Sequence, residues 1–326
     1  MKVAVLGAGA WGTALARILH GNGHRVTLWT RNADTLADIQ RTRRNERYLP
    51  GIELPSDWIC EPDFAKATAQ QDCVVLAVAS RGFREIATRL RDSKATLVSV
   101  TKAIEYETGK TMCGVLRECA PQSRVAALSG PTFAMEVARG IPTAIVAACE
   151  DKNARRTVQE IFHQPKFRVY RSPDLLGVEL GGALKNIIAI AAGVCDGLGL
   201  GDNSKAALIT RGIAEVRRLG VACGAQPETF AGLSGLGDLT LTCFSRQSRN
   251  RELGERAGRG EKMETLIQPG EKLAEGVPTA RSAHLLARKL DVETPIIDEV
   301  HAMLYERKNI RLAVNDLLSR DTKAED

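Results

Sequence analysis

Several features that mark common classes of protein are scarce or absent in this sequence of 326 residues. Aromatic residues make up only 4% of the chain, and its cations are scattered among aspartates and glutamates despite a net charge of +6. A nucleic-acid-binding surface usually needs clustered cations with interleaved aromatics, so the composition argues against nucleic acid as a partner. The excess of cations fits either a mildly basic surface or the binding of an anionic cofactor and an anionic substrate.

Long hydrophobic runs are also missing. The longest apolar stretch, Ile187 to Cys195, is about half of the ~20 residues that a membrane-spanning helix requires. A strand-like run, Val3 to Leu6, follows Met1 and Lys2 directly and leaves no room for the regions of a secretory signal. We therefore expect a cytoplasmic protein without a membrane span.

The cysteines do not form a metal-binding pattern. The chain has eight of them, and no two have the CxxC spacing that is typical of zinc sites. Most lie within apolar runs, which predicts small buried side chains in a reducing compartment. We therefore expect no metal ion in this protein.

The first half alternates short β-branched runs with helical patterns, which is the rhythm of βαβ units. Strands that are apolar throughout belong to a parallel sheet covered on both faces. The predicted strands are Val3–Leu6, Arg25–Trp29, Cys73–Val78, Thr96–Val100, Val125–Ser129 and Ala144–Ala148. Residues 1 to about 170 are therefore expected to form a doubly wound α/β domain.

After Pro173 the strand signal disappears and helical patterns take over. Pro173 ends the preceding extended segment, and Asp174 is suited to cap the N-terminus of a helix. The predicted helices are Asp174–Val194, Lys205–Cys223, Glu271–Leu290 and Pro295–Tyr305. We therefore predict two domains, 1–172 and 173–326, of which the second is all-α. Its charged tail from Ser319 has no apolar periodicity and is predicted to be flexible.

A glycine motif follows the first predicted strand. Gly7, Gly9 and Gly12 form the pattern GxGxxG ahead of a helical segment. In dinucleotide-binding domains the first glycine allows a tight turn, the second lets the backbone approach the pyrophosphate, and the third allows close packing of helix on strand. The helix N-terminus then faces the phosphates. The motif therefore predicts a Rossmann-like domain that binds a dinucleotide.

The end of the second predicted strand bears on the choice between NAD and NADP. NAD-specific domains carry a carboxylate about 20 residues after the glycine motif, which binds the ribose 2′-hydroxyl. This chain has no carboxylate there before Asp34 and has Arg31 instead. A guanidinium suits a 2′-phosphate, so we expect NADP(H) to be accepted as well as NAD(H). The alternative is that Arg31 is a solvated loop cation.

Lys185 lies in an apolar helical segment of the second predicted domain. The small residues Gly181, Gly182 and Ala183 let a backbone or a ligand come close, and an apolar environment favours the neutral amine that proton transfer uses. A lysine that extends to solvent explains this segment equally well.

Two polar segments follow in glycine-rich surroundings. Asp238 is suited to bind an ammonium or a substrate hydroxyl, and Arg249 with Asn250 is suited to hold a phosphate. Taken separately, Asp238 is also consistent with a helix N-cap, and Ser248 to Arg251 with the polar start of a helix.

Across nearly its whole length the chain resembles the bacterial-type NAD(P)-dependent glycerol-3-phosphate dehydrogenases. Within the segment SVTKAIE, Ala103 replaces a glycine that is more frequent in the family, a difference of one methyl group. The matching segments are GAGAWGTALA (7–16), NERYLPG (45–51), SVTKAIE (99–105), SGPTFAMEV (129–137), GGALKNIIAIAAG (181–193), GLGDLTLTC (235–243), SRNRELG (248–254) and AEG (274–276).

The resemblance implies reversible reduction of dihydroxyacetone phosphate to sn-glycerol 3-phosphate by hydride transfer from NADH or NADPH, supplying glycerophospholipid synthesis. It implies that Lys185 donates and accepts the proton, with Lys102 and Asp238 as further catalytic residues. The implied substrate-binding residues are Lys102, Gly130, Thr132, Lys185, Asp238, Ser248, Arg249 and Asn250. The implied cofactor-binding residues are Gly7, Gly9, Trp11, Gly12, Arg31, Lys102, Ala134, Arg249, Leu273 and Glu275.

Thr242 and Phe83 align with site positions of related enzymes. A homodimer is expected because it is the commonest oligomer among soluble proteins. Two alternatives remain at this point: another NAD(P)-dependent hydroxyacid dehydrogenase, and a non-catalytic module that senses a dinucleotide. The second would not need the set of proton-transfer and phosphate-binding groups that this sequence carries.

Overall fold

The structure is a computed structural model that describes residues 1–268, 274–321 and 324. The chain forms two compact units. Unit 1 consists of residues 1–102 and 110–179, and unit 2 consists of residues 103–109 and 180–326. The two units thus divide between residues 179 and 180. Residues 103–109 belong to unit 2, although in the sequence they lie between the two parts of unit 1. A domain boundary at residue 172 stays a prediction.

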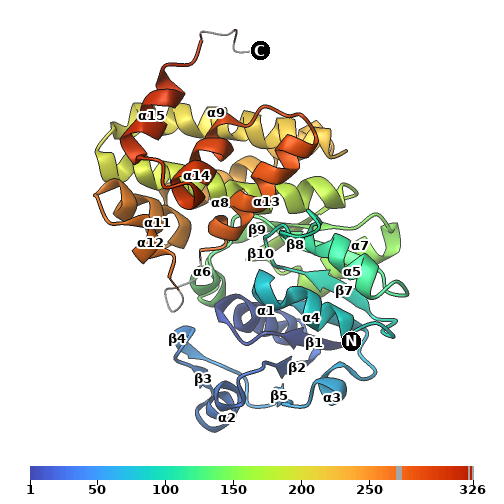
Figure 1. The fold of residues 1–326 in the computed structure, drawn as a ribbon. Coiled ribbons are helices and arrows are strands. Elements are labelled where there is room, and N and C mark those ends of the chain that lie inside the picture. Colours follow the sequence, from blue (N-terminus) through green and yellow to red (C-terminus); the bar gives the residue numbers. More distant parts are fainter. Residues whose placement is uncertain (269–273, 322–323, 325–326) are drawn as a thin grey trace. The chain divides into compact units, whose positions relative to one another are not determined.

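Among the residues that the structure describes, unit 1 contains an eight-stranded sheet with the order β10-β9-β8-β7-β6-β1-β2-β5 (Figure 1). All six predicted strands are present within two residues of their predicted ends, and β5 and β10 are additional. The strands are β1 Lys2–Leu6, β2 Arg25–Trp29, β5 Ile59–Cys60, β6 Cys73–Leu76, β7 Thr96–Ser99, β8 Val125–Ser129, β9 Thr143–Ala148 and β10 Phe167–Ser172.

One strand pair departs from the parallel pattern that the apolar runs predict. β9 is antiparallel to β8, and every other neighbouring pair in this sheet is parallel. The link between β8 and β9 holds only the five-residue helix α6, Ala134–Ala138. Such a helix is about 7.5 Å long, whereas a five-residue strand is about 16 Å long. Because α6 is too short to return the chain to the start of β8, β9 runs in the opposite direction.

Helices cover both faces of this sheet. Val3 and Val5 of β1 share a core with Leu15 of α1 and Ile161 of α7, while α4 and α5 pack together over the other face. A separate antiparallel pair joins β3 Arg44–Asn45 to β4 Leu49–Glu53. The doubly wound fold is therefore confirmed. The helices are α1 Ala10–Gly21, α2 Ala33–Thr42, α3 Phe64–Thr68, η1 Ser80–Gly82, α4 Phe83–Thr88, α5 Met112–Cys119, α6 and α7 Lys152–Phe162.

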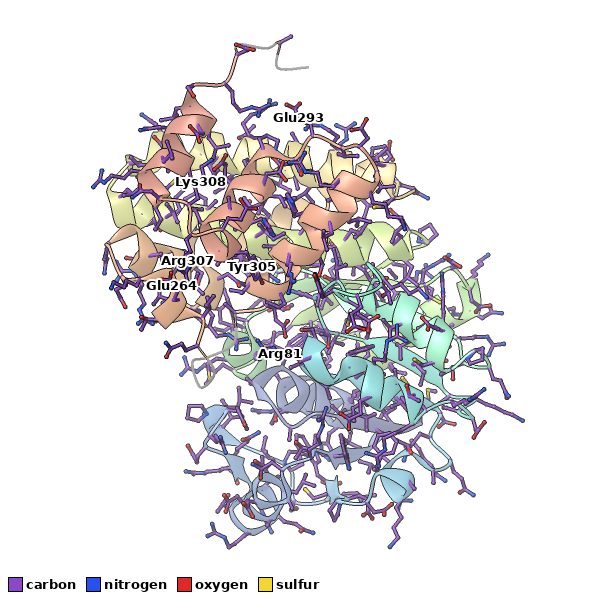
Figure 2. All side chains as sticks on the ribbon, in the orientation of Figure 1. Arg81, Glu264, Glu293, Tyr305, Arg307 and Lys308 are labelled. Carbon is purple, nitrogen blue, oxygen red and sulfur yellow. The ribbon has the colours of Figure 1, made fainter. Side chains whose placement is uncertain are left out.

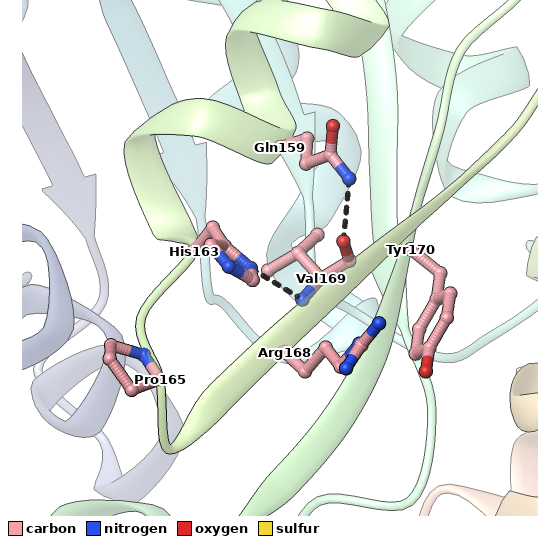
Figure 3. Close-up of a pocket in the computed structure, with 6 residues that line it drawn as sticks. All are labelled: Gln159, His163, Pro165, Arg168, Val169 and Tyr170. Atoms are coloured by element: carbon pink, nitrogen blue, oxygen red, sulfur yellow. Dashed lines mark hydrogen bonds between the residues drawn. The ribbon is translucent and has the colours of Figure 1, made fainter.

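A surface hollow of about 350 Å³ lies beside the edge strand β10 (Figure 3). There Gln159 donates from Nε2 to the carbonyl of Val169 at 2.7 Å, and the amide of Val169 donates to Nδ1 of His163 at 3.3 Å. Side chains of α7 and its C-cap thus occupy the backbone groups that an edge strand otherwise offers to another strand. The lining residues are Gln159, His163, Pro165, Arg168, Val169 and Tyr170.

All regular elements among the described residues of unit 2 are helical, as predicted. Asp174 caps α8, because its Oδ1 accepts the amide N–H of Gly177 at 2.9 Å. The predicted helix Glu271–Leu290 begins at Gly276, and residues 271–273 lie outside the described residues. The helices are α8 Leu175–Leu198, α9 Gly201–Ala222, η2 Pro227–Ala231, the π-turn η3 Leu233–Gly237, α10 Asp238–Phe244, α11 Arg249–Gly258, α12 Met263–Leu266, α13 Gly276–Lys289, α14 Pro295–Tyr305 and α15 Ile310–Leu318.

Ion pairs join the last helices of unit 2 (Figure 2). Lys308, which follows α14, lies 2.6 Å from a carboxylate oxygen of Glu299 in α14 and 2.7 Å from one of Asp316 in α15. Arg307 lies 3.4 Å from Glu264 of α12. Part of the tail that is predicted to be flexible, residues 322–323 and 325–326, lies outside the described residues.

Among the described residues, one helix, α8, is long and apolar enough to cross a membrane. Of its most apolar 18-residue window, 94% is buried inside the protein. An α-helix that is apolar all round is typical of the core of a large protein as well as of a membrane, and the burial of α8 fits a core helix.

Candidate active site

The glycine motif forms a cradle at the carboxyl end of β1. Gly7 has φ +116°, and a Cβ there would lie 2.3 Å from the carbonyl oxygen of Ala77. A Cβ on Gly12 would lie 2.0 Å from the carbonyl oxygen of Gly7, so only glycine lets α1 pack this closely on the turn. Gly9, in contrast, has no atom within 4 Å of such a Cβ. The turn and packing roles of the first and third glycines are therefore visible in the structure, and Gly9 leaves space.

A pyrophosphate fits this cradle on two further grounds. β1 lies between β2 and β6, which is the switch point where open α/β sheets bind their ligands. The N-terminus of α1 has Gly9 as its N-cap, no side-chain cap and no acidic residue in its first turn. Its first N–H groups and the positive end of the helix dipole therefore suit an anion.

Arg31 follows the carboxyl end of β2 and is half-exposed. Its Nη2 donates to the carbonyl of Gly82 at 3.4 Å, and its Nη1 lies 3.2 Å from Oε2 of Glu85. Ion pairs this exposed contribute little, about 0 to 1 kcal/mol. The contact with Glu85 is therefore weak enough for a phosphate dianion to replace it, and the role of Arg31 at the 2′ position stays a prediction.

Three predicted site residues of unit 1 meet at one carbonyl. Nζ of Lys102 donates to the carbonyl oxygen of Gly130 at 2.9 Å, and Oγ1 of Thr132 donates to the same oxygen at 3.1 Å. Gly130 has φ +152°, and a Cβ there would lie 3.1 Å from Cα of Ile145. This conformation and this proximity both favour glycine, which explains the residue type at the end of β8.

In unit 2, Lys185 is buried and paired, which excludes the interpretation that it extends to solvent. Its side chain is 8% exposed, and Nζ donates to Oδ1 of Asp238 at 2.7 Å and to Oγ1 of Thr242 at 2.5 Å. Thr242 itself donates to the backbone carbonyl of Asp238 at 2.6 Å, so it accepts from Lys185. The two contacts fix the direction of the ammonium group. Asp238 is the first residue of α10 and not its N-cap, which is Gly237.

The glycines near Lys185 explain how Asp238 reaches it. A Cβ on Gly181 of α8 would lie 2.9 Å from the carbonyl oxygen of Ser234 in the π-turn η3. Gly235 also approaches the backbone of Phe230, where a Cβ would lie 2.2 Å from the carbonyl oxygen. Because both positions lack a side chain, η3 packs on α8 and presents the start of α10 to Lys185.

The predicted phosphate segment begins α11, next to the residue that follows Lys185. Ser248 caps this helix, accepting the N–H of Arg251 at 3.2 Å, so the interpretation as a helix start is correct. Nδ2 of Asn250 donates to Oδ1 of Asn186 at 2.9 Å, and Oδ1 of Asn250 accepts the N–H of Gly276 at 2.9 Å. Arg249 is exposed and, among the residues that the structure describes, forms an ion pair with no carboxylate.

Four glycines bring α8 and α11 into backbone contact. A Cβ on Gly193 of α8 would lie 1.9 Å from the carbonyl oxygen of Arg251, and a Cβ on Gly254 of α11 would lie 2.0 Å from that of Ile190. Gly197 and Gly258, each one turn further along its helix, have backbone atoms of the other helix within 2.8 Å of such a Cβ. This packing sets the position of the phosphate segment relative to Lys185.

The remaining predicted site residues lie at or next to the starts of helices, or outside the described residues. Trp11 and Ala134 lie partly buried in the first turns of α1 and α6, and Phe83 is 1% exposed at the start of α4. Glu275 is the residue before α13, and Leu273 lies outside the described residues. No metal-binding cluster of three or more His, Cys, Asp or Glu side chains occurs in the described part of the chain.

Sequence reasoning from the residues alone did not select Asn186 and gave no role to Thr242. Asn186 is 5% exposed and Thr242 is 4% exposed, so both are buried polar side chains beside Lys185. The signal for Asn186 is its position next to the lysine, within a stretch of α8 from Leu180 to Cys195 that is otherwise apolar. Thr242 follows Asp238 by one helical turn, which places the two side chains on the same face.

A dinucleotide cradle in one unit and a buried lysine with a carboxylate partner in the other define a nicotinamide-dependent dehydrogenase as the class of protein. Two family models refine this class. The N-terminal part of NAD-dependent glycerol-3-phosphate dehydrogenase matches residues 2–155, and the C-terminal part matches residues 174–315. The chain therefore belongs to the family of NAD-dependent glycerol-3-phosphate dehydrogenases, which confirms the resemblance.

Individual relatives agree over the full length. The chain is 49% identical to glycerol-3-phosphate dehydrogenase (NAD(P)+) of Syntrophotalea carbinolica, covering 100% of this chain and 99% of that protein. It is 46% identical to the enzyme of the same name from Fusobacterium nucleatum, with 100% and 98% covered. The crystal structure of glycerol-3-phosphate dehydrogenase from Coxiella burnetii matches with a TM-score of 0.93 and 38% identity, covering 98% of this chain and 99% of that one.

Proposed function

We propose that this protein is an NAD(P)-dependent oxidoreductase that interconverts dihydroxyacetone phosphate and sn-glycerol 3-phosphate. The observation that carries the proposal is the buried contact of Lys185 with Asp238 at 2.7 Å, next to the Asn186–Asn250 bond that leads to the phosphate segment. Family membership, shown by the two family models over residues 2–155 and 174–315, supports it.

The role of Lys185 follows from the charge that develops on the substrate. When bound, the nicotinamide supplies a hydride to C2 of the ketone or accepts one from the alcohol. Reduction leaves negative charge on the C2 oxygen, and the ammonium of Lys185 stabilises this charge and donates a proton to it. Asp238 and Thr242 hold the ammonium in one direction, so little reorganisation is needed during the reaction. In the reverse direction Lys185 takes the proton from the hydroxyl.

The phosphate segment supplies binding energy for positioning C2. Arg249 binds two phosphate oxygens with the parallel donors of its guanidinium, and Ser248 and Asn250 add hydrogen bonds. Lys102 contributes positive potential, and its ammonium donates to the carbonyl oxygen of Gly130, which also accepts from Thr132. The binding of a remote phosphate thereby lowers the barrier at the carbon that reacts.

We further propose that both NADH and NADPH are used, since Arg31 replaces the carboxylate of NAD-specific domains and its exposed ion pair with Glu85 is weak. A cytoplasmic location, a homodimer and a role in supplying glycerophospholipid synthesis complete the proposal. The dimer rests on the frequency of homodimers among soluble proteins.

Oxidation of NADH and NADPH with dihydroxyacetone phosphate, beside a panel of other keto compounds, tests the proposed function. We expect dihydroxyacetone phosphate to be used far better than unphosphorylated dihydroxyacetone or 2-keto acids. The substitution Arg249→Lys should lower kcat/KM for the phosphorylated substrate by about 2 to 4 kcal/mol, a factor of ~30 to 1000. Arg246→Lys, at another exposed arginine three residues earlier, is the matched control and should change little.

The kcat/KM for unphosphorylated dihydroxyacetone should be almost insensitive to Arg249→Lys, because this substrate has no phosphate for Arg249 to bind. The KM of the cofactor is measured separately, since Arg249 is also a predicted cofactor contact. Equal proportional losses on both substrates would assign Arg249 to the cofactor or the fold. Preference for a 2-keto acid over dihydroxyacetone phosphate would instead identify another hydroxyacid dehydrogenase.

A further inference from the structure

We propose that residues 103–109, named the strap here, hold Lys102 in position and that Ser282 and Tyr106 are positioning residues for this lysine. The strap interrupts unit 1: residues 1–102 and 110–179 belong to unit 1, whereas 103–109 pack with unit 2. Lys102 is therefore the last residue before the chain crosses from one unit to the other. The inference rests on the proposed function in one respect, namely the role of Lys102 at the substrate.

The first anchor of the strap is a buried hydrogen bond to α13. Oγ of Ser282 donates to the carbonyl of Ile104 at 3.1 Å, and the carbonyl of Pro278 lies 3.2 Å from the same hydroxyl. Ser282 is 1% exposed, and the strap residues Ala103 and Ile104 are 3% and 2% exposed. A buried carbonyl that loses its donor costs free energy, so this contact favours a single position of Ile104.

The second anchor is a stack of side chains over the outer part of the strap. The guanidinium of Arg281 lies 3.9 Å from the ring centroid of Tyr106 and 5.7 Å from that of Tyr305. Tyr305, at the end of α14 and labelled in Figure 2, donates to the carbonyl of Val277 at 2.8 Å. Both distances are within the range of cation–π attraction, about 6 Å. α13 and α14 thus both contribute to holding Tyr106.

The strap is also closed on itself. Oγ1 of Thr108 donates to Oε2 of Glu105 at 2.6 Å, and the N–H of Gly109 donates to the carbonyl of Glu105 at 2.9 Å. Gly109, the last residue of the strap, has φ +67°, a conformation that favours glycine. The strap therefore has hydrogen bonds of its own in addition to its two anchors.

The anchors of the strap act on Lys102 because only a short length of chain separates Ile104 from Lys102. Consecutive Cα atoms are about 3.8 Å apart, so Lys102 lies no further than about 7.6 Å of chain from Ile104. Fixing Ile104 on Ser282 therefore restricts the backbone of Lys102. The hydrogen bond of Lys102 to Gly130, within unit 1, restricts its ammonium.

A double-mutant cycle with Lys102 tests the proposal. In the full-length enzyme, Tyr106→Leu and Ser282→Ala should each lower kcat/KM for dihydroxyacetone phosphate by on the order of 10-fold, since misplacement by about 1 Å can cost 100-fold. In a Lys102→Met background, the same substitutions should lower it by less than about twofold, because the lysine that they position is gone.

Two further variants separate positioning from general damage. Tyr106→Phe keeps the aromatic ring beside the guanidinium of Arg281 and should have wild-type activity, in contrast to Tyr106→Leu. Tyr170→Leu is the matched control: Tyr170 is another exposed tyrosine, 46% against 39% for Tyr106, and its ring lies 5.2 Å from the guanidinium of Arg168. It should have wild-type activity. If Ser282→Ala does not fold, the surface substitution Tyr106→Leu still decides the result.

Equal losses in the wild-type and Lys102→Met backgrounds would overturn the positioning role, because the strap would then act elsewhere. Wild-type activity of both Tyr106→Leu and Ser282→Ala would also overturn it. A different result would contradict the proposed function itself: Lys102→Met with undiminished turnover of dihydroxyacetone phosphate removes Lys102 from the site and the strap proposal with it.

Discussion

Adding one methyl group at Gly193 changes the contact between the two helices that carry the predicted proton donor and the phosphate segment. The Cβ of Gly193→Ala would lie 1.9 Å from the carbonyl oxygen of Arg251, and 2.8 Å from its carbonyl carbon and from the amide of Glu255. All three atoms belong to the backbone, so no side-chain rotation relieves the overlap. An ordinary contact begins at 3.4 Å, and the helices must therefore separate by about 3.4 − 1.9 = 1.5 Å.

Two effects of this separation are expected. Overpacking of a close helix contact costs typically 1–3 kcal/mol of folding free energy, and the backbone overlap places Gly193→Ala at the upper end of that range. Ser248, Arg249 and Asn250 at the start of α11 would move relative to Lys185 on α8. Because a misplacement of about 1 Å can cost 100-fold in rate, kcat/KM for dihydroxyacetone phosphate should fall by on the order of 100-fold.

The assay combines urea unfolding with steady-state kinetics on the folded fraction. Gly114→Ala is the matched control, because Gly114 also lies within a helix but its nearest neighbours are side-chain atoms of Lys110 and Thr111 at 3.3 to 3.7 Å. Removal of a helical glycine there should change stability by no more than about 1 kcal/mol. Wild-type stability and wild-type kcat/KM of Gly193→Ala would refute the idea that backbone contact between α8 and α11 aligns the site.

Three further changes test single residues. Lys185→Ala should lose at least ~10² to 10⁴ in kcat while the protein stays folded and binds cofactor, because the proton donor is gone. Arg31→Asp should raise the KM for NADPH and spare that for NADH, since a carboxylate repels the 2′-phosphate. Burial raises the pKa of Glu215 to about 7. The folded protein then keeps a proton that the unfolded chain loses near pH ~4.3, so the free energy of unfolding should fall by up to about 3 kcal/mol as pH rises from ~4.5 to 7. Glu215→Gln should flatten this dependence, measured by urea unfolding across that range.

Each of these changes has a contrary result, and the changes at Arg31 and Glu215 also have control variants. Near-normal kcat for Lys185→Ala would remove Lys185 from the mechanism. Arg31→Ser, which adds no carboxylate beside Glu85, separates loss of the cation from new repulsion, and an equal response of both cofactors would show that Arg31 does not contact the 2′ position. Glu228→Gln, at an exposed glutamate, should leave the pH dependence of stability intact. The idea for Glu215 fails if its variant keeps the wild-type slope.

Much of the fold is predictable from local patterns. The six predicted strands were identifiable from β-branched runs, and α14 has the predicted bounds Pro295–Tyr305. β10 has the sequence FRVYRS, in which buried and exposed residues alternate. As an edge strand it places arginines and a tyrosine toward solvent, so a search for continuous apolar runs does not find it.

The chemistry of the site is partly predictable. The GxGxxG motif is local, and Gly7 and Gly12 each have a geometric reason in the turn after β1. The contact of Lys185 with Asp238 joins residues 53 positions apart, and no periodicity indicates such a distance. Resemblance to a family placed both residues at the site but left open whether Asp238 binds Lys185 or a substrate hydroxyl. The bond between Ser282 and Ile104 joins residues 178 positions apart and has no sequence signal of this kind.

The strap belongs to unit 2 but lies within the sequence of unit 1, and this limits how the gene can be divided. A cut at the codons between residues 172 and 173 would give a second polypeptide without residues 103–109. This polypeptide would lack Ile104, to whose carbonyl Ser282 of α13 donates. The surface of α13 around Ser282, which binds the carbonyl of Ile104, would then be exposed to water in the isolated fragment, and exposed apolar surface favours poor solubility. A soluble fragment of unit 2 would need the strap sequence joined ahead of residue 180 by a linker, as a rearranged order of segments and not as a simple truncation.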